Sequence, residues 1–344
     1  MKNKLLVVYN TCGVAQPRHP GGMQAILGYY IHSIEGLLNQ NFEGYKIVVS
    51  MYKNAHHYKK LLAQKFGNKI SYVFYDEGNL TVNQTYNKTV QLCVEKFGKF
   101  EGYLYVNSGM SFGPIRTSHH PIHGSADHDA NYDVLSELYR TFKSGPYGLV
   151  SIQVDWDAGY STIGYQYDSG PPAQIQGEDF IIPVGKAVNG HMYMASNELF
   201  EAYDNKIIPD VFRAFCTESV FSFLTSAIQK KWVIMKDILL HHQGALEGPS
   251  SAEHSQTSVE HKNSWNNLLC GRNALDFIND PEAIEAGLGY EECNEIMLHK
   301  EEAFDENGYA KYSEKLREIN KKYLFLSKDE FDYNTIRCNA IWGS

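Results

Sequence analysis

The triplet Asp155-Trp156-Asp157 places two carboxylates on either side of an indole ring. Two carboxylates one residue apart are suited to hold a divalent cation such as Mg²⁺ or Mn²⁺, which prefers oxygen ligands. The same residues suit a carbohydrate, because an indole face stacks on a sugar ring and a carboxylate accepts hydrogen bonds from hydroxyl groups. The triplet therefore predicts either a metal site or part of a carbohydrate-binding site.

The stretch 116–133 is polar and holds several groups that could bind a metal: His119, His120, His123, Asp127, His128 and Asp129. Imidazole and carboxylate ligands suit zinc, but their spacing here matches no structural zinc pattern. We interpret the stretch as a solvated loop. Six cysteines are scattered along the chain without a CxxC pair, so neither a disulfide framework nor a zinc site is indicated.

The composition is that of a folded globular protein, with 43% hydrophobic and 21% charged residues. The formal net charge is −9, so nucleic acid is not an expected partner, because a phosphate backbone requires clustered Lys and Arg. The first apolar run, residues 1–9, is too short for a signal peptide core, and no run reaches the roughly 18 residues of a membrane span. We expect a cytoplasmic protein with no membrane span.

Strands and helices are expected to alternate over residues 4–240. Short apolar runs predict strands, and apolar residues at helical spacing predict the helices between them. The expected strands are 4–9, 45–51, 70–75, 102–106, 147–154, 191–194 and 233–240, and the expected helices are 23–38, 58–66, 82–97, 134–143, 197–203 and 217–231. This rhythm predicts an α/β fold with a mostly parallel central sheet flanked by helices.

Ligands of open parallel sheets bind beyond the carboxyl ends of the strands, so the loops after Tyr9, Ser50 and Val106 should frame the site. Residues 244–264 are rich in Gly, Ser and His and have no periodicity, and the residues that follow read as mainly helical. We therefore expect a main domain over 1–250 and a helical C-terminal extension over 251–344.

The order of these elements over roughly residues 4–246 resembles the glycosyltransferase A fold, and specifically its family 2 pattern. The resemblance implies that 1–250 is the nucleotide-sugar-binding and catalytic domain, with a nucleotide-diphosphate sugar as donor and the first strand end, Tyr9-Asn10-Thr11, close to the nucleotide. In the family an acidic residue after the second strand contacts the base, and here that place is held by Ser50, whose hydroxyl can still bond a uracil edge. The resemblance also assigns Asn87, on the third expected helix, to the donor site.

The resemblance places a metal-binding Asp-x-Asp motif after the fourth expected strand, where this chain has Asn107-Ser108-Gly109. A neutral amide binds Mn²⁺ or Mg²⁺ far less well than a carboxylate, so metal dependence should be weakened or lost. The diphosphate would then need other partners, such as Arg116, Lys186 or a helix N-terminus. If the strands are aligned one unit differently, Asp155 and Asp157 become the metal site and Asn107 becomes structural.

Two further positions match the family pattern. Glu218, in Cys216-Thr217-Glu218, corresponds to the general base, which would accept the proton of the acceptor hydroxyl during an inverting transfer. The other interpretation of Glu218 is stabilisation of a first helical turn. His242, after the last expected strand, corresponds to a histidine that completes the metal shell or touches the diphosphate, and its other interpretation is a structural or surface residue.

Three functions remain open from the sequence. The first is a glycosyltransferase that moves a sugar to an acceptor hydroxyl, with Glu218 as base. The second is a catalytically inactive carbohydrate- or nucleotide-binding protein on the same fold. The third is a nucleotidyltransferase, which normally has a Gly-rich phosphate loop with a basic residue after the first strand, and residues 13–22 offer three glycines and Arg18.

Overall fold

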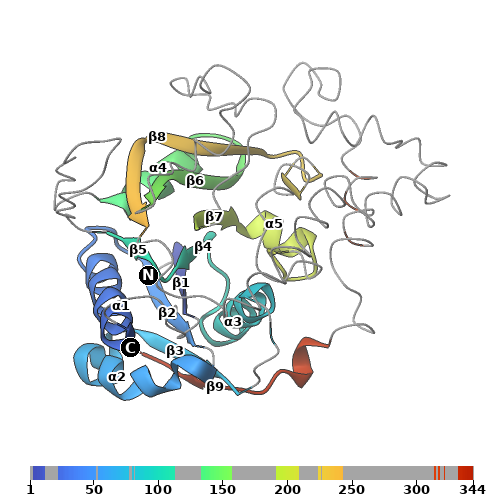
Figure 1. Ribbon diagram of the computed structural model, residues 1–344. Helices are drawn as coiled ribbons and strands as arrows, with labels where there is room; N and C mark the ends of the chain where they lie inside the picture. The colour runs from blue at the N-terminus through green and yellow to red at the C-terminus, as the bar shows by residue number, and fades with distance from the viewer. Residues whose placement is uncertain are drawn as a thin grey trace, which may run out of the picture.

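The computed structural model describes residues 3–11, 22–51, 53–76, 80, 82–112, 133–156, 191–208, 224–225, 227–242, 314, 317, 321 and 332–343. Within these residues one sheet of nine strands runs through the molecule in the order β5-β8-β6-β7-β4-β1-β2-β3-β9 (Figure 1). The strands are β1 (Leu5–Thr11), β2 (Tyr45–Met51), β3 (Ser71–Tyr75), β4 (Gly102–Asn107), β5 (Met110–Ser111), β6 (Tyr147–Trp156), β7 (Met192–Ser196), β8 (Lys231–His242) and β9 (Cys338–Ile341).

The helices of the described part are α1 (Gly22–Leu38), α2 (Lys59–Phe66), α3 (Val82–Phe97), α4 (Val134–Ser144) and α5 (Asn197–Ala202), with 3-10 turns η1 (Lys53–Tyr58), η2 (Gly67–Lys69) and η6 (Tyr333–Thr335). Strands β1, β2, β3 and β4 pair in parallel, and β6 pairs in parallel with β8. The remaining pairings, β3–β9, β4–β7, β6–β7 and β5–β8, are antiparallel. Six strands therefore run in one direction, which confirms the α/β fold with a mostly parallel central sheet and flanking helices.

Alternating residues of the central strands point to opposite faces of the sheet, and each face has its own core. On one face Leu5, Val7 and Tyr9 pack in a cluster with residues of α1, α2 and α4. On the other face Leu6 and Val8 pack in a cluster with residues of α3 and α5. Because both faces are covered, the seven residues of β1 are all buried, as expected for a central parallel strand.

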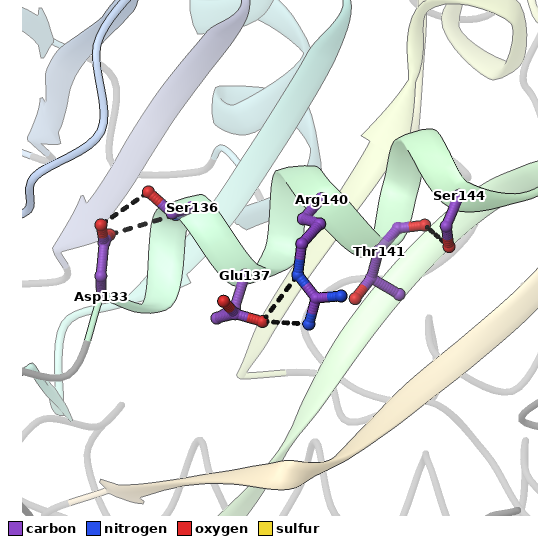
Figure 2. A network of polar contacts seen from close by, with 6 residues as sticks. All are labelled: Asp133, Ser136, Glu137, Arg140, Thr141 and Ser144. Carbon is purple, nitrogen blue, oxygen red and sulfur yellow. Dashed lines mark hydrogen bonds and ion pairs between the residues drawn. The ribbon is translucent and has the colours of Figure 1, made fainter. Parts of the chain in front are cut away.

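Helix α4 shows how local sequence sets the bounds of an element (Figure 2). The side chain of Asp133 is the N-cap and accepts hydrogen bonds from the backbone N–H of Ser136, at 3.2 Å, and from its hydroxyl, at 2.6 Å. One turn later Arg140 donates to Glu137 on the exposed side of the helix. The hydroxyl of Ser144 donates to the carbonyl of Thr141 at 2.8 Å in the last turn. The cap satisfies a backbone donor that the first turn would otherwise leave unpaired.

The last described residues return to the sheet, although the sequence predicts a helical extension there. Strand β9 pairs with β3, from Tyr72 opposite Ile341 to Tyr75 opposite Cys338. Gly343 leaves no room for a side chain, since a Cβ there would lie 2.6 Å from the carbonyl oxygens of Asn68 and Ile70. Most of 251–344 lies outside the described residues, so the division of the chain at residue 250 stays a prediction.

Candidate functional site

Three polar side chains lie in register at the carboxyl ends of the central strands. Asn10 of β1 is paired with Ser50 of β2 on one side and with Asn107 of β4 on the other. Residues paired in this way project from the same face of a sheet, and Asn10 continues the series Leu6, Val8. The three side chains therefore form a polar row, Ser50–Asn10–Asn107, on the face that α3 covers.

The middle of this polar row is buried without hydrogen-bond partners. Asn10 is 4% exposed and Ser50 is 0% exposed. Both amide atoms of Asn10 and the hydroxyl of Ser50 are buried atoms that bond to no protein group in the described part of the chain. An unsatisfied buried donor or acceptor costs about 1 to 3 kcal/mol, so the folded protein keeps three such groups at a considerable cost in stability. Groups of this kind need a structural or functional explanation.

The polar row continues to His191, which precedes the antiparallel strand β7. The backbone N–H of Asn107 donates to the carbonyl of His191 at 2.8 Å, and the Asn107 amide lies 3.4 Å from His191 Nδ1. Burial lowers the pKa of His191 to about 4, because loss of water penalises the charged imidazolium. The imidazole is therefore neutral at pH 7, and it contributes hydrogen bonds rather than positive charge to the site. No sequence pattern marks His191 as a site residue, although it starts an expected strand.

The turn Asn107-Ser108-Gly109 is held in place from the opposite face of the sheet. The hydroxyl of Tyr9 donates to the carbonyl of Ser108 at 2.6 Å, and the hydroxyl of Ser33 on α1 donates to the carbonyl of Met110. Tyr9 itself is fully buried. Its side chain therefore supports the turn from the opposite face of the sheet. The predicted contact of Tyr9 with the nucleotide would then be made by its backbone at the strand end. Thr11 is also buried, and its hydroxyl donates to the carbonyl of Ser50 at 3.2 Å.

Asn87, predicted to lie in the donor site, joins three distant parts of the chain. Its carbonyl oxygen accepts from the backbone N–H groups of Ile207, at 2.9 Å, and Ile208, at 3.1 Å. Its amide nitrogen donates to the carbonyl of Ile208 at 2.8 Å and contacts the hydroxyl of Tyr333 at 3.1 Å. The side chain is 0% exposed. The structure thus gives Asn87 a packing role, and a role in donor binding stays a prediction.

The predicted residues of β6 and β8 lie side by side along their backbones. The register pairs Asp155 with His241 and Trp156 with His242, and His241 is in turn paired with Ser111 of β5. These strand ends lie at the same edge of the sheet as the polar row, because β6 and β8 run in the direction of β1. The structure describes only the backbone at these four residues of β6 and β8, so their proposed contacts with a metal or an acceptor stay predictions.

Other predicted residues lie outside the described part of the chain: Arg18, Arg116, the histidine-rich stretch 119–129, Asp157, Lys186 and Glu218. No group of three or more His, Cys, Asp or Glu side chains that could hold a metal ion occurs among the residues that the structure does describe. Within the same ranges, no helix combines the length and the apolar character needed to cross a membrane.

The floor below Asn107 and His191 is aromatic. Tyr105 and Tyr193 face each other across β4 and β7 with ring centroids 4.9 Å apart and planes 4° from parallel. Tyr86 of α3 meets Tyr105 edge-on at 5.2 Å. These rings are buried. They hold β4, which carries Asn107, against β7, which His191 precedes. The alternation of tyrosines in Gly102–Asn107 is the sequence signal for this packing.

No family model matches the sequence, and a search of curated proteins found no match. Among solved structures, 4-diphosphocytidyl-2C-methyl-D-erythritol synthase of Anaerococcus prevotii is similar to this chain with a TM-score of 0.37 and 11% identity, over 76% of this chain and 96% of that one. HddC of Yersinia pseudotuberculosis is similar with a TM-score of 0.37 and 11% identity, over 75% of this chain and 99% of that one.

Proposed function

We propose that the chain is a nucleotide-dependent transferase, and that the base and ribose of its nucleotide bind at the polar row. The observation that carries this proposal is the unpartnered amide of Asn10 beside the unpartnered hydroxyl of Ser50. A nucleobase edge offers adjacent donors and acceptors, and an amide with a free N–H and a free oxygen can bond both. The polar row is neutral at pH 7, which suits the uncharged part of a nucleotide better than its phosphates.

The turn Asn107-Ser108-Gly109 would lie next to the phosphates, since it follows the neighbouring strand β4. Its residues do not fit a divalent metal held by two carboxylates, because the turn supplies an amide, a hydroxyl and backbone groups. Neutralisation of the diphosphate therefore falls to cationic groups of this chain, and Arg116 and Lys186 are the candidates from the sequence.

The leading reaction is transfer of a sugar from a nucleotide-diphosphate sugar to an acceptor hydroxyl. Glu218 would accept the proton of that hydroxyl while its oxygen attacks the anomeric carbon and the nucleoside diphosphate leaves. Asp155, Trp156 and Asp157 would bind the acceptor through hydroxyl contacts and ring stacking. This assignment rests on the resemblance of the chain to glycosyltransferases and on the order of its strands.

Nucleotidyl transfer is the second candidate, and a specific feature favours it. The stretch 13–22, with three glycines and Arg18, follows the strand end that carries Asn10 and reaches the first residue of α1, Gly22. Backbone N–H groups of a glycine-rich loop can surround phosphates, and an arginine can bind them through two parallel hydrogen bonds. In this reaction a sugar phosphate would attack the α-phosphate of a nucleoside triphosphate and release pyrophosphate.

One experiment separates the two reactions. The protein is incubated with a panel of nucleotide-diphosphate sugars, and in parallel with nucleoside triphosphates and sugar phosphates, each with Mn²⁺ or with chelator. Phosphorus NMR then identifies the product: free nucleoside diphosphate indicates glycosyl transfer or donor hydrolysis, and pyrophosphate indicates nucleotidyl transfer. Nucleotide binding without either product assigns the chain to the inactive relatives of the fold, and absence of any nucleotide binding refutes the proposal.

The variant Asn10→Leu tests the role of the polar row in nucleotide binding. Leucine has a similar size and removes two unsatisfied polar atoms, so we expect the free energy of unfolding of the ligand-free protein to rise by about 1 to 2 kcal/mol. We expect nucleotide affinity to fall at least about tenfold, since each such bond contributes about 1 kcal/mol or more. Urea unfolding measures the first effect, and isothermal titration calorimetry with the best nucleotide of the panel measures the second.

Thr11→Val is the matched control for Asn10→Leu. Thr11 is the next residue of the strand and is equally buried, but its hydroxyl has a partner in the carbonyl of Ser50. Its replacement should therefore lower the free energy of unfolding by about 1 kcal/mol. If Asn10→Leu lowers stability as Thr11→Val does, the amide has a partner in solution and the argument from unsatisfied groups fails.

A further inference from the structure

A basic segment, residues 53–69, interrupts a chain that is acidic as a whole. This segment of 17 residues contains five lysines and no aspartate or glutamate, whereas the chain has a formal net charge of −9. The lysines are Lys53, Lys59, Lys60, Lys65 and Lys69, and His56 and His57 lie among them. The chain as a whole is negatively charged, but this segment is locally positive.

Three of the five lysines, Lys60, Lys65 and Lys69, are exposed to solvent. The segment forms η1, α2 and η2, and Ala55, Tyr58, Leu62 and Phe66 pack into the core on one side. Lys60 and Lys65 are exposed on the other side of α2. Between them lies Leu61, which is 46% exposed and is one of two large hydrophobic side chains so exposed in the described part of the chain. A leucine exposed between lysines can enter a membrane interface while the lysines contact anionic headgroups.

A small pocket adjoins this surface. It is lined by Lys46 and Lys69 together with Leu38, Tyr45, Ser71 and Gly343, and its volume is about 200 Å³. Lys46 Nζ lies 4.6 Å from the centre of the Phe97 ring, and within the described ranges neither lysine forms an ion pair with a carboxylate. Lys65 of α2 forms an ion pair with Glu35 of α1, and Leu38, one turn further along α1, lines the pocket. The pocket and the exposed side of α2 are therefore neighbours.

We propose that residues 53–69 and the adjoining pocket dock on an anionic lipid membrane, with Leu61 at the interface and a lipid phosphate between Lys46 and Lys69. A cluster of four to eight lysines on an amphipathic helix attracts anionic lipid, and an inserted leucine adds a contribution that does not depend on charge. Nucleic acid fits this surface less well, because proteins bind unpaired bases mainly with aromatic and arginine side chains, whereas the exposed residue here is a leucine. This inference stands apart from the proposed reaction, since neither the basic segment nor the pocket contains a residue of the polar row.

The test is cosedimentation of the full chain with two kinds of vesicle. One kind is pure phosphatidylcholine, and the other contains about one third phosphatidylglycerol, which gives the anionic surface that a polybasic helix requires. We expect binding to the anionic vesicles alone, and weaker binding as salt is raised, because salt screens surface charge. Equal binding to both vesicles, or no binding to either at low salt, overturns the proposal.

Substitutions in the basic segment test which residues contact the membrane. Lys60→Glu with Lys69→Glu should lower the partition coefficient on anionic vesicles at least about tenfold, since each lysine contributes roughly fivefold. Leu61→Ser should lower it less and leave the dependence on salt unchanged. Lys143→Glu with Lys230→Glu alters the net charge equally, at exposed or partly exposed lysines on α4 and before β8, and should leave binding within about twofold. Equal losses in both double variants would overturn the assignment to 53–69. Displacement of the vesicles by duplex DNA at equimolar phosphate would overturn the choice of a membrane as the partner.

Discussion

Asn87→Ala is expected to lower the free energy of unfolding by about 3 to 5 kcal/mol, because several buried groups lose their partner together. The amide bonds the backbone of Ile207 and Ile208 and the hydroxyl of Tyr333, and all of these contacts are buried. Alanine cannot replace them, and water has no access to a side chain that is 0% exposed. Urea unfolding followed by circular dichroism measures the loss.

Gln91→Ala is the control for this effect. Gln91 lies one turn later on α3, and its amide also donates to a backbone carbonyl, that of Asn205 at 3.0 Å, but the bond is exposed to solvent. Its loss should change the free energy of unfolding by less than about 0.5 kcal/mol. Tyr333→Phe removes a single partner of Asn87 and should cost about 1 kcal/mol. A small stability loss in Asn87→Ala, with a large loss of nucleotide affinity, would instead support the predicted donor-binding role.

The second large effect is expected at Glu218. If Glu218 is the general base, Glu218→Gln should lower kcat about 100- to 10,000-fold, because the amide cannot accept the acceptor proton. The Kd of the donor should stay within about twofold, since the base acts on the acceptor and not on the nucleotide. Steady-state kinetics with the active donor and calorimetric titration of the same donor measure the two quantities.

Glu198 provides the matched control, because it lies in the first turn of α5 and forms a partly exposed ion pair with Lys230 at 3.1 Å. A carboxylate in a first turn stabilises a helix by about 0.3 to 1 kcal/mol through the helix dipole. Glu198→Gln should therefore change stability slightly and leave kcat unaltered. If Glu218→Gln behaves in the same way, Glu218 stabilises the first turn of its helix, and another residue is the general base.

Much of the sheet could be predicted from local sequence. The strand 45–51 and the helix 82–97 have the bounds that the sequence predicts, because their apolar patterns and their ends are determined within the segments. The row Ser50–Asn10–Asn107 was predicted in part, since the three strand ends were expected to meet at one edge. Their register follows from parallel pairing of β1 with both neighbours.

The features that sequence reasoning missed depend on residues far apart in the chain. Strands β5 and β9 are two and four residues long and gain their hydrogen bonds from β8 and β3, so no local pattern marks them. His191 enters the row through antiparallel pairing of β7 with β4. Asn87 lies on the expected helix, but its hydrogen-bond partners come from residues 207–208 and 333, so no local pattern predicts them. The basic segment was missed because net charge was considered for the whole chain.

The position of β9 has a consequence for the order in which the protein folds. Residues 71–75 of β3 leave the ribosome long before residues 338–341, their neighbours in the finished sheet. During synthesis the outer edge of β3 therefore remains an unpaired strand edge, which is where other chains can add. Closure of that edge must also overcome the entropy of bringing distant segments together, which slows folding. The last strand thus completes the sheet late, and until then the nascent chain keeps an open strand edge to which other chains can pair.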